Sequence, residues 1–211
     1  MTHAASALLP VRFLDRSAAV HGDKTAVIDG SRELTYRDLH DRCRRLAGAL
    51  VADGLGPGAR VAVLSHNTLE MLEAHYGVPY AGGVLVPLNA RLSAADIAYI
   101  LEHSGAEVLI ATDPLVAVAR EASELAGDAV KVIAGCDQYE DYVASAAPVP
   151  SEKVTVHTDL AVATFDSVGG ALTRLELLQF RDQADRQRNV VLFDHTDKRT
   201  YLAQNGLVTA Q

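Results

Sequence analysis

Several features that mark whole classes of proteins are scarce in this sequence. It has no tryptophan and two cysteines among 211 residues, and its 19 basic residues are outnumbered by 27 acidic ones, for a net charge of -8. Cys43 and Cys136 are too few and too far apart in sequence for a disulfide framework or a zinc-ligand cluster. The acidic excess argues against a nucleic acid or an anionic membrane as partner.

Long hydrophobic runs are missing as well. No apolar stretch approaches the ~18 residues that a membrane span requires, and Arg12 and Asp15 come too early for a secretory signal. We therefore expect no transmembrane segment, and a cytoplasmic location in which both cysteines stay reduced. What is present is ordinary globular material, with 49% hydrophobic and 22% charged residues, in a chain long enough to bury a core.

The stretch from Arg60 to Asn89 organises the rest of the chain. Two short apolar runs, Val61–Leu64 and Val84–Leu88, flank a segment with helix signals, which predicts strand, helix, strand. A crossover of this kind is almost always right-handed, so the two strands should lie parallel in one sheet with the helix packed across it.

The helix inside this stretch has its own start and stop signals. Asn67 and Glu70 have the spacing of a capping box, and Pro79 should bend or end the helix. Its apolar residues recur every three or four positions and predict one face that presses on the sheet; they are Leu69, Leu72, Tyr76 and Tyr80.

The residues before this stretch predict a hairpin followed by a helix. Asp29-Gly30-Ser31 favours a tight turn between short strands at Thr25–Ile28 and Glu33–Thr35. Thr35 and Asp38 then have the spacing of a capping box at the start of a helix.

The residues after it continue the alternation of helices and strands. Ser93 and Asp96 form another capping box. Two further strands follow at Val108–Ala111 and Val130–Ile133. Between them, Asp113 and Pro114 have the character of the N-cap and the first residue of a helix. Such alternation is typical of an α/β protein with three layers, a mostly parallel sheet with helices on both faces. We assign residues 1–150 to this α/β domain.

From Gln138 the alternation weakens, and we treat residues 151–211 as a linker and a divergent C-terminal segment. We expect a short helix at Tyr139–Ala146, a strand at Leu160–Phe165 and a highly charged helix at Ala171–Asn189. The last stretch predicts a small β-meander with strands at Val190–Phe193, Thr200–Ala203 and Leu207–Thr209.

Glycine clusters are candidate phosphate loops, and their position decides between them. Phosphates bind where a loop leaves a strand and opens a helix, whereas Gly54–Gly58 and Gly82-Gly83 lie between a helix and a strand, where they stop a helix. Ser167, Gly169 and Gly170 lie after an expected strand and before an expected helix, so they are the candidate cofactor-binding residues of a degenerate phosphate loop. This segment lacks a lysine, and an ordinary strand-to-helix turn is the commoner structure for such a sequence.

The eight histidines supply one further candidate. His66 lies at the carboxyl end of an expected strand, where open α/β sheets bind ligands, although a surface histidine is the commoner role. Two acidic clusters around His157 and His195 match no metal motif with defined spacing, so we assign no metal ligands. We assign no catalytic residue either, because the sequence has no Gly-x-Ser-x-Gly elbow and no Cys-His pair in a recognisable context.

Several segments have sequences distinctive enough to compare with known protein families. They are ELTYRDL at Glu33–Leu39, GLGPGARVAV at Gly54–Val63, Asn67, EAHYGVPYAGGVLVPLNARL at Glu73–Leu92, and QYEDY at Gln138–Tyr142. Together they resemble the N-terminal region of the AMP-forming acyl-CoA synthetases, members of the adenylate-forming ligase superfamily.

This resemblance implies a two-step reaction, in which a carboxylic or fatty acid and ATP give an acyl-adenylate, and coenzyme A then displaces AMP. It implies ATP, magnesium and coenzyme A as cofactors and a small-molecule carboxylate as substrate. Where the family carries a Ser/Thr/Gly-rich loop ending in Pro-Lys-Gly, this chain has Phe165–Leu172. The family's adenine-binding, ribose-binding and lid segments do not appear before Gln211.

Three hypotheses follow. The first is a truncated or diverged acyl-CoA synthetase that is inactive alone. The second is a non-catalytic α/β module that binds a nucleotide, an acyl group or a partner protein, with homo-oligomerisation through an unpaired sheet edge. The third is a shifted reading frame that replaces the phosphate loop from about Ser167 onward.

Overall fold

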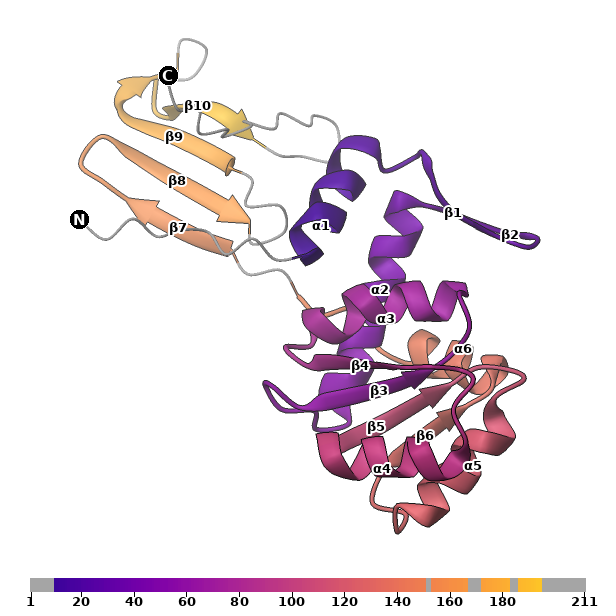
Figure 1. The fold of residues 1–211 in the computed structure, drawn as a ribbon. Coiled ribbons are helices and arrows are strands. Elements are labelled where there is room, and N and C mark those ends of the chain that lie inside the picture. Colours follow the sequence, from indigo (N-terminus) through magenta and orange to yellow (C-terminus); the bar gives the residue numbers. More distant parts are fainter. Residues whose placement is uncertain (1–9, 151–152, 167–171, 183–185, 195–211) are drawn as a thin grey trace, which may run out of the picture. The chain divides into compact units, whose positions relative to one another are not determined.

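The computed structural model describes residues 10–150, 153–166, 172–182 and 186–194 (Figure 1). The described residues divide into two compact units, one formed by residues 10–149 and the other by the described residues from Pro150 onward. We name them the parallel-sheet unit and the antiparallel-sheet unit, after the sheet that each contains.

A four-stranded parallel sheet lies at the centre of the parallel-sheet unit. Its strand order is β4-β3-β5-β6, with β3 at Arg60–Leu64, β4 at Val84–Leu88, β5 at Ala106–Ala111 and β6 at Lys131–Ala134. Strands β3 and β4 run parallel, with Val61 opposite Leu85. The predicted parallel crossover between them is therefore confirmed.

Helices cover both faces of this sheet (Figure 1). Helices α2 (Tyr36–Ala52), α3 (Leu69–Tyr80) and α6 (Cys136–Ala144) pack on one face, and α4 (Ala94–Ser104) and α5 (Val116–Leu125) pack on the other. Successive strand residues point to opposite faces, so Val61 and Val63 enter the first core while Ala62 and Leu64 enter the second. The predicted three-layer α/β class is confirmed.

Short-range sequence signals fix most of the element starts. Thr35 with Asp38, and Ser93 with Asp96, form the two predicted capping boxes at the starts of α2 and α4. The predicted hairpin is present as β1 (Thr25–Asp29) and β2 (Arg32–Thr35), and α1 (Pro10–His21) precedes it. The predicted start of α5 is wrong, because this helix begins at Val116 with Leu115 as its N-cap.

Helix α3 differs from its prediction in two respects. Its N-cap is Thr68 rather than Asn67, and Glu70 does not close a capping box, because its carboxylate accepts a hydrogen bond from Arg32 instead. The expected sheet-facing stripe, which includes Leu69 and Tyr76, packs against the hairpin, α1 and α2. The side that faces the sheet carries smaller residues, among them Ala74 and Val78.

The antiparallel-sheet unit contains one four-stranded sheet in the order β10-β9-β8-β7. Its strands are β7 (Lys153–His157), β8 (Ala161–Asp166), β9 (Leu172–Arg181) and β10 (Asn189–Asp194). The predicted strands at Leu160–Phe165 and Val190–Phe193 are present as β8 and β10. The predicted strands at Thr200–Ala203 and Leu207–Thr209 lie outside the described residues.

The helix predicted at Ala171–Asn189 is wrong, because most of that segment is strand β9. Leucines alternate with charged residues through Arg174, Leu175, Glu176 and Leu177, which is the two-residue period of a strand.

Candidate functional site

The carboxyl ends of the four parallel strands form one edge of the sheet, where ligands of open α/β folds bind. The connection after β3 runs through α3 on one face, and the connection after β5 runs through α5 on the other. The topological switch point therefore lies between β3 and β5.

Two hydroxyl side chains close this switch point. Ser65 Oγ, just after β3, lies 2.7 Å from Thr112 Oγ1, just after β5, and 3.0 Å from Thr68 Oγ1. Ser65 is 5% exposed and Thr112 is 1% exposed. The hydroxyls satisfy one another here, so a ligand at this edge would lie to one side, over β3 and β4.

A cavity of about 460 Å³ lies at that position. Its polar lining includes His66 and Asn67 after β3, His75 on α3, and Asn89 and Arg91 after β4. The structure thus places His66, the histidine singled out from the sequence, on a cavity wall with an exposed side chain.

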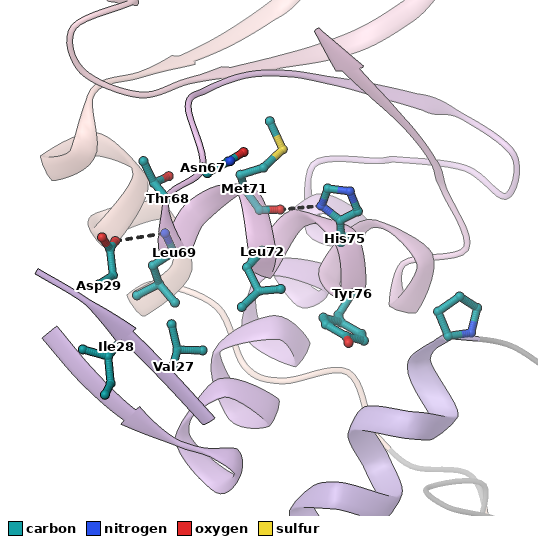
Figure 2. A pocket seen from close by; sticks show the side chains of 11 residues that line it. Val27, Ile28, Asp29, Asn67, Thr68, Leu69, Met71, Leu72, His75 and Tyr76 are labelled. Atoms are coloured by element: carbon teal, nitrogen blue, oxygen red, sulfur yellow. Dashed lines mark hydrogen bonds between the residues drawn. The ribbon is translucent and has the colours of Figure 1, made fainter. Parts of the chain in front are cut away.

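A second cavity, of about 550 Å³, lies between the β1–β2 hairpin and α3 (Figure 2). Val27 and Ile28 line it from the hairpin, and Leu69, Leu72 and Tyr76 line it from α3. It is mostly apolar, and it shares Asn67, Met71 and His75 with the first cavity. The exposed side of the first half of α3 is therefore the wall common to both.

Polar contacts from the hairpin hold the start of α3. The carboxylate of Asp29 accepts a hydrogen bond of 3.0 Å from the backbone N–H of Leu69 (Figure 2), and Arg32 bridges Asp29 and Glu70. The Leu69 N–H and Arg32 together lower the pKa of Asp29. Burial opposes ionisation of Glu70, but hydrogen bonds from Arg32, from Thr68 and from the backbone, together with the charge of Arg32, lower the pKa of that carboxyl too.

A second ion cluster lies one turn further along α3. Glu73 has no exposed surface, and its carboxylate accepts hydrogen bonds from Arg42 on α2 and, at 2.8 Å, from the Tyr139 hydroxyl on α6. Arg42 also binds Glu140 on α6. Burial raises the pKa of Glu73 despite these partners, and burial together with Glu73 raises the pKa of Tyr139.

These ion clusters were missed by sequence reasoning. The available signal was a pair of glutamates, Glu70 and Glu73, on a helix that is otherwise largely apolar. Such residues are almost never fully buried unless they are paired. Their partners Arg32, Arg42 and Tyr139 lie 38, 31 and 66 residues away, so no local pattern identifies them.

The starts of helices α3 and α6 do not fit the phosphates of ATP or coenzyme A. A helix N-terminus attracts phosphate through its free N–H groups and its dipole. At α3 the carboxylate of Asp29 already takes the Leu69 N–H, and at α6 the carboxylate of Asp113 takes the Cys136 N–H at 3.1 Å. Both positions would repel an anion.

The structure was also compared with the needs of a magnesium ion. Within residues 10–150, 153–166, 172–182 and 186–194, no three His, Cys, Asp or Glu side chains come together to hold a metal ion.

The candidate phosphate-loop residues Ser167, Gly169 and Gly170 lie outside the described residues. Their assignment assumed a following helix, whereas the next described element is strand β9. The assignment therefore stays a prediction that has lost one of its two supports.

Two family models match the chain. The model of the AMP-binding enzymes matches residues 14–177, and the model of the YidC periplasmic domain matches residues 153–211. The second match covers less than a third of the chain and begins with the first strand of the antiparallel-sheet unit.

Known proteins similar to this chain are CoA ligases. An acetate/butyrate–CoA ligase of Arabidopsis thaliana is 45% identical over 120 residues, which is 57% of this chain and 21% of the ligase. A 4-hydroxybutyrate–CoA ligase of Metallosphaera sedula is 40% identical over 109 residues, 52% of this chain and 20% of that ligase. The chain thus spans about a fifth of the length of these relatives.

Solved structures agree with the sequence comparison. A benzoate CoA ligase of Burkholderia xenovorans superposes with a TM-score of 0.63 at 30% identity, over 75% of this chain and 34% of that one. The N-terminal domain of FACL13 from Mycobacterium tuberculosis superposes with a TM-score of 0.60 at 26% identity, over 74% and 43% of the two chains.

Fold and comparisons together define the class, which is that of the adenylate-forming ligases with an N-terminal three-layer α/β sheet. More particularly, the chain belongs to the family of AMP-binding enzymes. The resemblance seen in the motifs between Glu33 and Tyr142 is confirmed.

Proposed function

We propose that this chain carries the N-terminal part of an enzyme that activates a small carboxylic acid with ATP and transfers the acyl group to coenzyme A. The observation that carries this proposal is the 45% identity to a CoA ligase over 120 residues. The relatives' names include acetate, butyrate and 4-hydroxybutyrate, which supports a short acid as the substrate.

The proposed reaction has two displacement steps. A carboxylate oxygen attacks the α-phosphorus of ATP and pyrophosphate leaves; the thiolate of coenzyme A then attacks the acyl carbon and AMP leaves. In this proposal the parallel-sheet unit acts as scaffold, because carboxylates occupy the starts of α3 and α6 and its described residues contain no cluster of three metal-ligating side chains. ATP, magnesium and coenzyme A are cofactors of the proposed whole enzyme.

We further propose that the chain is inactive alone. It spans 21% of its relative, its segment Phe165–Leu172 contains no lysine, and carboxylates lie at the starts of α3 and α6. The test is ATP–pyrophosphate exchange with magnesium and acetate, butyrate, benzoate or octanoate, with a full-length CoA ligase as positive control. We expect no exchange, and exchange above background would overturn the inactivity.

A domain exchange tests the family assignment separately. Residues 10–149 would replace the matching segment of the Arabidopsis acetate/butyrate ligase. If this unit is a competent ligase scaffold, the hybrid should fold and retain acyl-CoA synthesis. A hybrid that folds but makes no acyl-CoA would contradict the proposed function, while leaving the inactivity of the isolated chain unaffected.

The second candidate is a non-catalytic module that binds a partner protein. Its support is the same pair of helix-terminal carboxylates, which disfavour nucleotide binding without affecting protein contacts. Calorimetric titration with ATP, with acyl-CoA and with the separately expressed remainder of a relative distinguishes the two candidates. Heat from ATP alone would count against this second function.

A cytoplasmic location is also a proposal. It is supported by the two free cysteines, Cys43 and Cys136. Within the described residues, none of the helices combines the length and the apolar character that crossing a bilayer takes. Since one matching model describes a periplasmic domain, fractionation of cells expressing the chain is the appropriate check.

A further inference from the structure

The two four-stranded sheets end, among the described residues, in four edge strands: β4 and β6 in one sheet, β7 and β10 in the other. An edge strand offers a row of unpaired N–H and C=O groups to another chain, and proteins blunt such edges with proline, charge or bulges. Whether each edge is blunted therefore indicates where a second chain can add.

These devices differ among the four edges. Strand β4 contains Pro87, which lacks an N–H donor. Strand β6 starts at Lys131, whose ammonium group pairs with Asp53. Strand β10 meets β9 with two breaks in register.

Strand β7 carries only a lysine at its first position, Lys153, as β6 does with Lys131. It pairs with β8 in an unbroken antiparallel register from Lys153 to His157, and it contains neither proline nor bulge. All five of its residues are exposed, including Val154 at 55% and Val156 at 45%. Exposed valines on a regular edge strand are unusual in a chain that avoids self-association.

The sequence of β7 is complementary to itself. If two copies pair in an antiparallel register centred on Thr155, Thr155 faces its own equivalent, Val154 faces Val156, and Lys153 faces His157. The lysine is the one formally charged residue of the strand at pH 7, and this register separates the two lysines. Like charges are thus not placed opposite one another, and the valines form cross-strand pairs.

The side chains behind β7 favour the same register. The pairing with β8 and β9 places Val154 and Val156 on the sheet face that carries Ala163 and Leu175. The opposite face carries Thr155, Thr164 and Arg174, with Thr155 and Thr164 3.4 Å apart. A second copy added at β7 would continue the apolar face and the polar face across the junction.

We propose that β7 is a dimerisation strand, through which two copies of this chain join their antiparallel sheets into one eight-stranded sheet about a twofold axis at Thr155. The contact is isologous, so each changed residue enters it twice. It is also small, since one five-residue strand meets another, and we place it among weak, concentration-dependent associations.

The test is the oligomeric state of the full chain, measured by sedimentation velocity across a concentration series up to about 1 mM. We expect a monomer–dimer equilibrium. Val156→Lys should weaken it by at least about tenfold, because the twofold axis places the lysine opposite Val154 twice. The matched control is Val84→Lys, an equally exposed valine, at 50%, on the edge strand with the proline, and it should leave the equilibrium unchanged.

A second measurement reads the register directly and does not depend on how Val156→Lys folds. Thr155→Cys, in a Cys136→Ser background, should give a disulfide-linked dimer under mild oxidation, while Val84→Cys in the same background should not. A monomer at every concentration, as when another segment of this chain occupies β7, would overturn the proposal. So would an equal effect of the two lysine variants, or no preference of Thr155→Cys for cross-linking.

Discussion

At the scale of single residues, the unusual feature of the parallel-sheet unit is its pair of buried glutamates. Glu73 has no exposed surface, and its carboxylate accepts hydrogen bonds from Arg42 and from the hydroxyl of Tyr139. Breaking such a pair costs more than forming it gains, because the remaining charge loses its partner away from water.

We predict that Glu73→Ala lowers the free energy of unfolding by about 2–3 kcal/mol, somewhat below the usual cost of breaking a buried pair, because Arg42 keeps Glu140. Glu140→Ala is the matched control: it removes the other carboxylate of the same arginine, but that side chain is 44% exposed, so we expect a loss below about 1 kcal/mol. Urea titration followed by circular dichroism measures both. Equal losses would contradict a special role for the buried partner.

A second residue-scale prediction concerns acid stability. The pKa of Asp29 is lowered in the folded state by the Leu69 N–H and Arg32, so its stabilising contribution is complete above the unfolded-state value of 3.8 and is lost as the pH falls through the lower folded-state value. Asp29→Asn should therefore reduce stability at pH 7 and flatten its fall in acid.

The measurement is the urea midpoint at a series of pH values from about 7 down to about 2.5. Glu107→Gln is the control, since this exposed carboxylate has no hydrogen-bond partner among the described residues. If the Asp29→Asn and wild-type curves ran parallel throughout, the hydrogen bond to α3 would not be linked to folding.

At the scale of elements, the sequence predicted what local signals determine. The two capping boxes, the hairpin turn and the apolar strands each depend on residues within a few positions of one another, and each is present. The orientation of α3 was predicted wrongly, because periodicity counted large apolar residues while Ala74 and Gly77 face the cores. The first N–H group of α3, that of Leu69, donates a hydrogen bond to the carboxylate of Asp29. These residues are 40 positions apart, so a search for local sequence patterns does not detect this contact.

The error at β9 has a different cause. The alternation of leucines and charged residues is a local strand signal, and pairing with β8 and β10 on either side adds to it. The candidate site shows a similar division. The position of His66 followed from a strand end, whereas the cavities and the ion clusters depend on tertiary contacts.

The packing of α2 against α3 gives the element-scale prediction. A Cβ at Gly77 would lie 2.6 Å from Leu46 Cδ2 and 2.9 Å from Leu46 Cγ. We predict that Gly77→Ala destabilises the fold by about 1–2 kcal/mol net, since overpacking exceeds the gain in helix propensity. Gly56→Ala, where a Cβ meets nothing within 4 Å, should be close to neutral in the same urea titration. A stabilised Gly77→Ala would show that the two helices can move apart at little cost.

At the scale of the whole molecule, two family models match different but overlapping parts of the chain. The AMP-binding match and the YidC periplasmic-domain match overlap between residues 153 and 177, and the boundary between the compact units falls just before that overlap, after Val149. The sequence indicated a change near this point through its weakening pattern. It indicated an antiparallel meander only from Val190 onward, and it did not identify the strands β7 and β9.

The two units predict a specific proteolytic pattern. Ala147–Pro150 belongs to neither a helix nor a strand, so brief digestion with a protease of low specificity should cut close after Pro150. The expected product is a stable fragment ending near residue 150, identified by mass spectrometry. Val156→Lys is a suitable control, since it changes the second unit and should leave this fragment intact. First cuts inside α2 or α3 would contradict the division.

The carboxylates of Asp29 and Asp113 carry a lesson for anyone who would engineer this scaffold. Each carboxylate lies at a helix start, where the backbone N–H groups could otherwise bind a phosphate. If a glycine-rich phosphate loop were engineered into this chain, these two negative charges would repel the nucleotide. Asparagine at both positions would preserve the shape and remove the opposition, and so would be the first step in redesign.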